Sequence, residues 1–419
     1  MQTHFTIAQK SSRVVAEAEA EIRKCVHCGF CMATCPTYQL LGDERDGPRG
    51  RIYMIKDMLE NERAPSAAVV THIDRCLSCL ACVTTCPSDV DYRRLVDTAR
   101  DYIEAKYQRP WFERMLRAVL AAVLPYPGRM RAALGLASLT GWAAPWMPAR
   151  VQAMFALAKK RGGPAAKIPV TKCEPKGRIA MLGGCAEPVM RPAVQAAAER
   201  LLTRAGYEIV RAPGEGCCGA LTHHLGKDAL GFARANVDAW TREIEGAGLT
   251  AIVVTASGCG SVVKDHGHML AGDPAYAAKA AKVAALAKDI SEVLEAADLP
   301  VLPPRGVKVA YQSACSLQHG QKITTGPARL LAAAGYEVVT PAEAHLCCGS
   351  AGTYNVLQPV IAGQLRDRKV AALVATGATV VASGNIGCIT QLAGEAGLAV
   401  VHTVELLDWA YGGPRPEGI

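Results

Sequence analysis

Aromatic residues are scarce in this chain of 419 residues, where five Phe, five Trp and twelve Tyr make up only 5% of the sequence. Half of the residues are nevertheless hydrophobic, with abundant Ala and Gly, so a sizeable core can form from small side chains. The net charge of +8 is a mild excess that does not by itself indicate binding to nucleic acid. The length predicts roughly two to four domains of ordinary size.

Motifs that bind nucleotides are also missing. No Gly-x-Gly-x-x-Gly follows an expected strand, and the stretch 225–228 (LGKD) lacks the glycine spacing and the Ser or Thr of a P-loop. Hydride removal from an alcohol normally needs a nicotinamide or a flavin. We therefore expect neither a nucleotide nor a flavin on this chain. Four histidines, which lack an evident substrate, are interpreted as structural or surface residues: His223, His224, His266 and His268.

The first residues, MQTHFTIAQKSSR, contain no apolar central region, so no secretory signal is expected. We predict a cytoplasmic chain, whose cysteines are kept reduced rather than paired as disulfides.

Acidic residues are nearly absent from residues 106–161, which hold ten Lys or Arg and a single acid, Glu113. An uncharged run of eighteen residues separates Arg131 from Arg150, close to the length of a membrane span, but glycines and prolines interrupt it. Two alternatives stay open for this segment: an amphipathic region on anionic lipid, or helices docked on a partner subunit or on the rest of the chain. Docking on protein is the favoured interpretation.

Cysteine, by contrast, is abundant, with seventeen residues. Such a number in a cytoplasmic chain indicates metal binding or redox chemistry. Sixteen of them form four groups of four, namely Cys25, Cys28, Cys31 and Cys35; Cys76, Cys79, Cys82 and Cys86; Cys185, Cys217, Cys218 and Cys259; and Cys315, Cys347, Cys348 and Cys388. Cys173 stands outside these groups and receives no role.

The first two groups have the spacing C-x2-C-x2-C-x3-C-P, the ferredoxin pattern for a [4Fe–4S] cluster. Soft thiolates suit iron, whereas zinc sites normally use two separated pairs of cysteines. In two-cluster ferredoxins the fourth cysteine of each run serves the other cluster. The predicted ligands are therefore the cluster 1 set, Cys25, Cys28, Cys31 and Cys86, and the cluster 2 set, Cys76, Cys79, Cys82 and Cys35.

The other two groups belong to a duplicated half of the chain. GRIAMLGG and RLLTRAGYEIVRAP recur as VKVAYQSA and RLLAAAGYEVVTPA, each copy holds one Cys-Cys-Gly, and the cysteine offsets are 130, 130, 130 and 129 residues. Alternating strands and helices predict two α/β units with parallel sheets. In the first unit we expect helices over 189–205 and 220–246 and another beginning near Cys259. Before the units we expect helices over 11–22, 50–61 and 92–107.

Within each unit the cysteines follow three different strands, and the ends of parallel strands lie at one edge of a sheet. We call these the first CCG set (Cys185, Cys217, Cys218 and Cys259) and the second CCG set (Cys315, Cys347, Cys348 and Cys388). Each is a possible additional site for an iron–sulfur cluster or another redox cofactor. Packed, reduced cysteines are the alternative, and cofactor binding is favoured for at least one set.

The segments KCVHCGFCMATCPTY, GDERDGPRGRI and THIDRCLSCLACVTTCP, together with both Cys-Cys-Gly units, resemble the iron–sulfur subunits of bacterial glycolate oxidase (glycolate dehydrogenase) over essentially the whole chain. The resemblance implies an electron-transfer subunit without catalytic residues of its own. Flavin-containing partner subunits would oxidise glycolate to glyoxylate, and electrons would pass towards the membrane quinone pool. It also implies peripheral association with the cytoplasmic face of the inner membrane.

Related families share the Cys-Cys-Gly architecture, so an iron–sulfur subunit for glycerol-3-phosphate or lactate, or a thiol/disulfide reductase similar to heterodisulfide reductase, is the alternative. Heterodisulfide reductase ends each set in CxxC, which provides five cysteines. Here Ala256 and Asn385 stand three residues before Cys259 and Cys388. Each set is thus one thiolate short, which argues against disulfide reduction.

The expected fold class is α+β multidomain, a helical ferredoxin-like domain for two [4Fe–4S] clusters followed by a tandem repeat of parallel-sheet α/β units. The expected domains are residues 1–105 (ferredoxin-like), 106–170 (basic helical docking region), 171–300 (first CCG unit) and 301–419 (second CCG unit).

Overall fold

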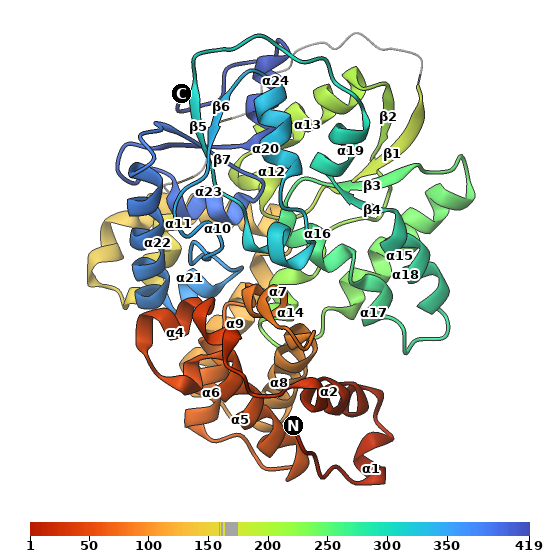
Figure 1. The fold of residues 1–419 in the computed structure, drawn as a ribbon, viewed down its shortest axis with the longest axis vertical. Helices are drawn as coiled ribbons and strands as arrows, with labels where there is room; N and C mark the ends of the chain where they lie inside the picture. The colour runs from red at the N-terminus through yellow and green to blue at the C-terminus, as the bar shows by residue number, and fades with distance from the viewer. Residues whose placement is uncertain (159, 161, 164–174) are drawn as a thin grey trace.

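The computed structural model describes residues 1–158, 160, 162–163 and 175–419, so Cys173 lies outside the described residues. It confirms the mixed fold class, with a helical N-terminal region followed by two α/β units that lie side by side (Figure 1). The N-terminal region consists of α1 (Ile7–Lys10), α2 (Arg13–Lys24), α3 (Phe30–Ala33), α4 (Pro36–Leu41), η1 (Glu44–Asp46), α5 (Pro48–Glu60), α6 (Ala67–Asp74), α7 (Ala81–Thr85) and α8 (Tyr92–Lys106).

Three helices form the core of the N-terminal region. Ile22 of α2, Ile55 of α5 and Leu95 of α8 are fully buried in one cluster. Pro36 and Pro48 occupy the first turns of α4 and α5, where the missing N–H costs no helical hydrogen bond. The helices expected over 11–22, 50–61 and 92–107 correspond to α2, α5 and α8. The first short cysteine run lies between α2 and α5 in the chain, and the second lies between α5 and α8.

The basic segment that follows folds into α9 (Trp111–Val123), α10 (Pro127–Thr140), η2 (Gly141–Trp146) and α11 (Ala149–Ala158). Part of it projects as the gold coils at the left edge of Figure 1. Among the described residues, the structure contains no helix with the length and apolar character needed to cross a membrane.

The first α/β unit contains a four-stranded parallel sheet of order β2-β1-β3-β4. Its elements are β1 (Gly177–Met181), α12 (Glu187–Met190), α13 (Ala193–Arg204), β2 (Tyr207–Val210), α14 (Ala220–His224), α15 (Leu230–Glu245), β3 (Ala251–Val254), α16 (Ser257–Val263), α17 (His266–Met269), α18 (Ala277–Leu286), β4 (Ala287–Asp289) and α19 (Ile290–Ala296).

The second unit repeats this topology in the order β6-β5-β7-β8, again with every pair parallel. Ala310 of the central strand pairs with Val339 and Val381, as Ala180 pairs with Val210 and Ile252 in the first unit. Its elements are β5 (Lys308–Tyr311), η3 (Ser316–Gly320), α20 (Gly326–Ala333), β6 (Glu337–Val339), α21 (Tyr354–Leu357), α22 (Pro359–Val374), β7 (Val380–Ser383), α23 (Ile386–Leu392), β8 (Ala399–His402) and α24 (Thr403–Ala410).

The prediction of a single helix over 220–246 is wrong, because the helix is interrupted between α14 and α15. Gly226 adopts a φ of +71°, and a Cβ atom at this position would lie 2.7 Å from the backbone oxygen of Arg100 in α8. The break therefore allows the N-terminal region to approach the first unit closely. Asp228 then accepts a hydrogen bond from the amide of Leu230, the first residue of α15.

One hydrophobic core joins the two units across α13 and α24, with Leu201 and Leu407 each 1% exposed. Two ion pairs add to this contact: Arg191 to Glu405 at 2.9 Å, and Arg200 to Asp408 at 2.6 Å. The loops after the strands are consequently held in fixed positions relative to one another.

Candidate metal centres

The eight cysteines of the two short runs lie around two neighbouring cavities. One is lined by the cluster 1 set, Cys25, Cys28, Cys31 and Cys86. The other is lined by the cluster 2 set, Cys35, Cys76, Cys79 and Cys82. Cys82 lies at the wall between them and also touches the first cavity. The fourth cysteine of each run thus faces the cavity of the other run, as crossed ligation requires.

The environment of these thiols fits iron–sulfur clusters. Burial, together with the neighbouring Cys25 and Cys86, raises the pKa of Cys31 to about 11. Burial likewise raises the pKa of Cys82 well above its usual value. Thiols crowded in this way stay protonated unless a cation replaces their protons, and soft metal centres do so. Four sulfur donors at each cavity are the number that a [4Fe–4S] cluster needs.

Two arginines of the N-terminal region contact cysteines of the cluster 2 set. Arg51 is 1% exposed, donates to the backbone oxygen of His72 at 2.8 Å, and lies 3.9 Å from the sulfur of Cys35. Arg100 donates to the backbone oxygen of Cys76 at 2.7 Å. Each arginine thus places a positive charge beside this set, which would stabilise the negative charge of a cluster bound by thiolates. The sequence did not reveal Arg100, because an arginine on an amphipathic helix carries no distinguishing signal.

Each CCG set converges at the carboxyl edge of its sheet. In the first unit the sulfurs of Cys185 and Cys217 lie 3.5 Å apart, and Cys218 is hydrogen-bonded to Cys259. In the second unit the sulfur of Cys315 lies 3.8 Å from that of Cys347, and the sulfur of Cys348 lies 3.3 Å from that of Cys388. Thiols that follow three different strands, the last of them in α16 or α23, therefore meet in each unit.

The two CCG sets face one shared cavity of about 190 Å³. Seven of their eight cysteines line it, all except Cys217. Ala256 and Asn385, which replace the fifth cysteines of heterodisulfide reductase, line it too. No fifth sulfur therefore reaches this cavity from either position.

The cluster 2 set adjoins the second CCG set. Cys79 and Cys315 pack against one hydrophobic cluster that contains Leu77 and Cys347. Burial raises the pKa of Cys79 well above its usual value, and the neighbouring Cys315 adds to this effect. Leu77 and Ser78 of the N-terminal region also line the shared cavity. The cysteine sets thus form a continuous series from the N-terminal region into the second unit.

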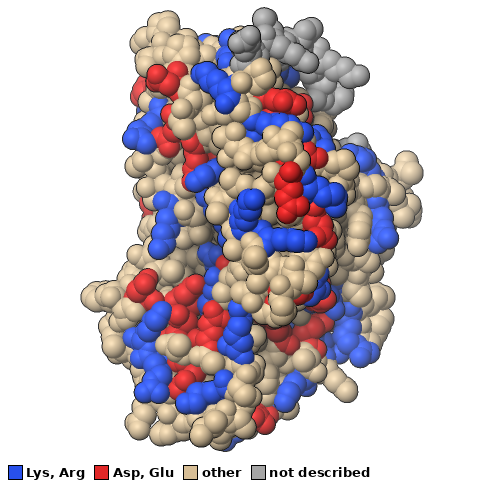
Figure 2. All heavy atoms as spheres, turned by 90° about the vertical axis from the view of Figure 1, so that its right-hand side faces the viewer, with Lys and Arg blue, Asp and Glu red and all other residues tan. Residues whose placement is uncertain are grey.

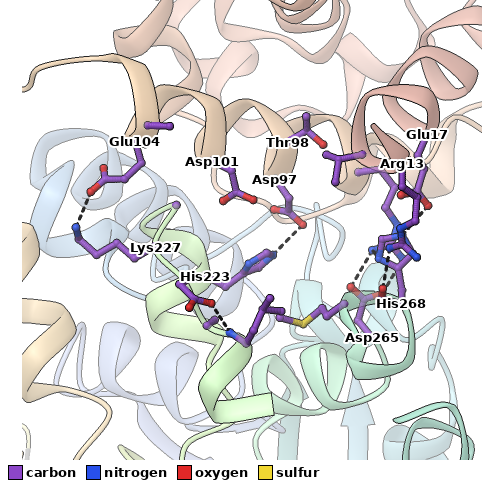
Figure 3. Close-up of a pocket in the computed structure, with 18 residues that line it drawn as sticks. Arg13, Glu17, Asp97, Thr98, Asp101, Glu104, His223, Lys227, Asp265 and His268 are labelled. Carbon is purple, nitrogen blue, oxygen red and sulfur yellow. Dashed lines mark hydrogen bonds and ion pairs between the residues drawn. The ribbon is translucent and has the colours of Figure 1, made fainter. Parts of the chain in front are cut away.

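The four histidines singled out in the sequence have structural contacts. His223 lies 3.1 Å from Asp97, and His268 lies 2.6 Å from Glu17, both across the groove of about 710 Å³ between the N-terminal region and the first unit (Figure 3). His266 contacts the backbone oxygen of Cys218. Burial and the charge of Arg100 lower the pKa of His224 to about 3. These contacts support the structural interpretation.

Further ion pairs cross the same groove. Arg94 of α8 binds both carboxylate oxygens of Asp265, at 2.6 and 2.8 Å, and Lys227 lies 2.5 Å from Glu104. Figure 3 shows Glu104 of α8 and Lys227, from the segment between α14 and α15, pointing toward each other. These ion pairs hold α8 of the N-terminal region against the first unit.

Comparison with known families agrees with this arrangement. The family described as "4Fe-4S dicluster domain" matches residues 21–90, and the family described as "Cysteine-rich domain" matches residues 179–264 and 309–393. Together with the sixteen grouped cysteines, these matches identify an iron–sulfur protein. A crystal structure of a hypothetical protein from Helicobacter pylori shares the fold, with a TM-score of 0.56 at 9% identity over 99% of this chain and 74% of that one.

Individual relatives are similar over most of the sequence. The glycolate oxidase iron–sulfur subunit of Escherichia coli is 43% identical across 98% of this chain and 99% of that protein, and a probable counterpart from Bacillus subtilis is 32% identical across 89% of each. Lactate utilization protein A of Bacillus licheniformis is 27% identical but matches only 55% of this chain. The chain therefore belongs to the family of glycolate oxidase iron–sulfur subunits.

Proposed function

We propose that this chain is the electron-transfer subunit of a flavin-dependent glycolate dehydrogenase. Flavin-bearing partner subunits would oxidise glycolate to glyoxylate, and this chain would conduct the electrons towards the quinone pool at the cytoplasmic face of the inner membrane. The names of the relatives from Escherichia coli and Bacillus subtilis support the substrate. When bound, iron–sulfur clusters supply one-electron oxidation and reduction.

The observation that carries this proposal is the graded exposure of the cysteine sets. Cys28 of the cluster 1 set is exposed, whereas Cys35, Cys76 and Cys82 of the cluster 2 set are buried. Cys79 in turn adjoins the second CCG set. A redox partner can therefore approach the cluster 1 set directly, and the buried sets lie behind it.

The side chains around Cys28 suit a protein donor. Val26, Phe30 and Tyr53 are 68%, 62% and 60% exposed, and the rings of Tyr53 and His27 are 5.8 Å apart. Exposed apolar residues that surround an exposed ligand are typical of a docking surface. We place the flavin-bearing donor here and the acceptor beyond the CCG sets.

The domain assignment remains part of the proposal: residues 1–105 for the two clusters, 106–170 for docking, and 171–300 and 301–419 for the CCG units. The end of α8 at Lys106 and the start of α9 at Trp111 support the first boundary. The two sheets support the other units. We propose a redox cofactor in at least one CCG set.

Iron analysis of the intact complex, with glycolate-dependent dye reduction, tests the function. We expect flavin-bearing subunits to co-purify, glycolate to reduce the dye, and the iron–sulfur signals of this chain to respond to glycolate in electron paramagnetic resonance. About eight irons would indicate that only the ferredoxin-type sets are filled, and a larger number would indicate occupied CCG sets. A complex whose iron–sulfur signals do not change when glycolate is added would contradict the proposal.

Crossed ligation can be tested with paired alanine variants. Cys25→Ala combined with Cys86→Ala removes two ligands from one crossed set, so about four irons should be lost. Cys25→Ala combined with Cys35→Ala removes one ligand from each crossed set, so about eight irons should be lost. Ligation within each run would give the reverse order. Circular dichroism in the far ultraviolet would show that both proteins remain folded.

The shared cavity favours a second candidate function, thiol/disulfide reduction. Seven cysteines from two units border one space, which a small disulfide could enter. The absence of a fifth cysteine at Ala256 and Asn385 argues against it. Disulfide reduction by the purified chain without flavin-bearing subunits would support this candidate over the first.

A further inference from the structure

Large apolar side chains are exposed together on α10 and η2. Leu136, Leu139, Trp142 and Trp146 are 63%, 79%, 73% and 76% exposed. The rings of Trp142 and Trp146 are in edge contact, with centroids 6.2 Å apart. Four such residues within eleven positions form an apolar patch of the kind that marks an interaction site, whereas single exposed apolar residues need no explanation.

The opposite side of α10 packs against the first unit. Met130 and Leu134 are buried against Val189 and Met190 of the first unit. Helix α11 is fixed in a similar way, since Met154 and Leu157 pack against a cluster that contains Leu357 of the second unit. The segment is therefore attached to both units on one side and presents the four apolar residues on the other.

The charged residues of the segment that carries this patch are all basic. Residues 114–158 contain no Asp or Glu. Within the described part of the chain, Arg114, Arg131 and Arg150 form no ion pair, although Arg117 on the buried side of α9 is paired with Asp74. By contrast, acidic and basic side chains are interspersed over the face of the molecule shown in Figure 2. The unpaired arginines complement an anionic surface.

We propose that α10 and η2 form a lipid-binding surface, with Leu136, Leu139, Trp142 and Trp146 inserted among the headgroups of an anionic bilayer. Trp prefers the membrane–water interface, and arginines near it are attracted to anionic lipid. A short apolar face flanked by cations lies in the interface rather than across it. The occupant is thus anionic phospholipid, not a protein.

The location of this surface fits the acceptor side of the chain. Helix α11, which follows η2, packs against α21 and α22, and these helices come directly after Cys347 and Cys348. A bound bilayer would therefore lie on the side of the second CCG set. The inference rests on the proposed function only for the nature of the acceptor, because lipid binding itself requires neither flavin nor glycolate.

Vesicle co-sedimentation of the full chain tests the surface. The probes are vesicles of phosphatidylcholine alone and vesicles that also contain phosphatidylglycerol. The wild-type chain should bind the anionic vesicles, and added salt should weaken this binding. Trp142→Ser combined with Trp146→Ser should reduce the affinity by about tenfold or more, and Arg131→Gln combined with Arg150→Gln should reduce it for anionic vesicles only.

The matched control is Ile7→Ser combined with Val301→Ser, since these residues are 88% and 79% exposed but lie on α1 and in the segment between α19 and β5. This control should bind vesicles as the wild type does, and unchanged iron content should verify folding of every variant. Equal binding by the double Trp variant and the wild type would overturn the inference. Loss of flavin-bearing subunits from the double Trp variant, with vesicle binding intact, would instead assign the surface to a protein partner. Glycolate-dependent dye reduction in detergent would report on the proposed function separately.

Discussion

The glycine of each Cys-Cys-Gly motif has a backbone conformation that other residues rarely adopt. Gly219 and Gly349 have φ angles of +89° and +88°. A Cβ atom on Gly349 would lie 2.6 Å from the backbone oxygen of Ala362 in α22, whereas one on Gly219 would lie 3.3 Å from the Cβ of Ala229. The motif thus needs glycine in both units, but the second unit also needs it for close packing.

Alanine substitution should separate these two requirements. Gly219→Ala should lower the free energy of unfolding by about 1–2 kcal/mol, the cost of a left-handed conformation. Gly349→Ala should cost about 2–4 kcal/mol, since α22 must also move. Urea unfolding of the two variants would measure the difference. Equal losses would show that the contact with Ala362 relaxes freely.

Helix α9 is attached to the N-terminal region by a group of buried charges. Arg109 and Arg117 are 6% and 5% exposed, and both donate to Asp74 at the end of α6, at 2.6 and 2.9 Å. Glu113 accepts from both arginines as well. Asp74 and Glu113, the acidic residues of this group, therefore anchor the basic segment to the N-terminal region.

Asp74→Ala should detach this helix. The variant leaves two buried guanidinium groups with Glu113 as their shared partner, which we expect to cost about 3–5 kcal/mol. Limited proteolysis should then cut within α9 faster than in the wild type. Asp57→Ala is the control, because the Asp57–Arg63 pair is exposed and should contribute less than about 1 kcal/mol. Comparable losses in the two variants would refute the anchoring role of Asp74.

At the level of elements, periodic patterns predicted the long helices but not the points at which helices are interrupted. The repeated segments GRIAMLGG and RLLTRAGYEIVRAP contain β1 and β2, because apolar runs near turn residues are a local signal. The break at Gly226 depends on Arg100, more than a hundred residues earlier, and no local pattern contains it. Strand β4, at one edge of the first sheet, has little local signal because it spans only three residues, Ala287–Asp289.

For the whole molecule, the sequence predicted which cysteines would meet but not how the sets would be arranged. Spacing specifies the two short runs, and duplication specifies the two CCG sets, whose cysteines follow equivalent strands. The shared cavity and the packing of Cys79 and Cys315 against one hydrophobic cluster depend on how the N-terminal region docks on the units. That docking uses ion pairs such as Arg94 with Asp265, whose residues are 171 positions apart.

This docking should depend on pH through His223 and Asp97, which face each other across the groove (Figure 3). Burial opposes charge on His223, but the charge of Asp97 and their hydrogen bond outweigh it and raise the pKa of His223. Burial likewise disfavours charge on Asp97, yet His223 lowers the pKa of Asp97 to about 2. The contact is therefore fully charged between about pH 4 and pH 6.5, the ordinary values of the two groups.

A raised histidine pKa contributes stability that is complete below about pH 6.5 and is lost as the pH rises through the folded-state value. His223→Gln should thus lower the unfolding midpoint most near about pH 6 and progressively less towards about pH 9. Lys227→Met is the control, because the ion pair between Lys227 and Glu104 crosses the same groove but contains no histidine. Its effect should be constant from about pH 6 to pH 9. A constant effect of His223→Gln over the same range would mean that the histidine stabilises docking by packing rather than by charge.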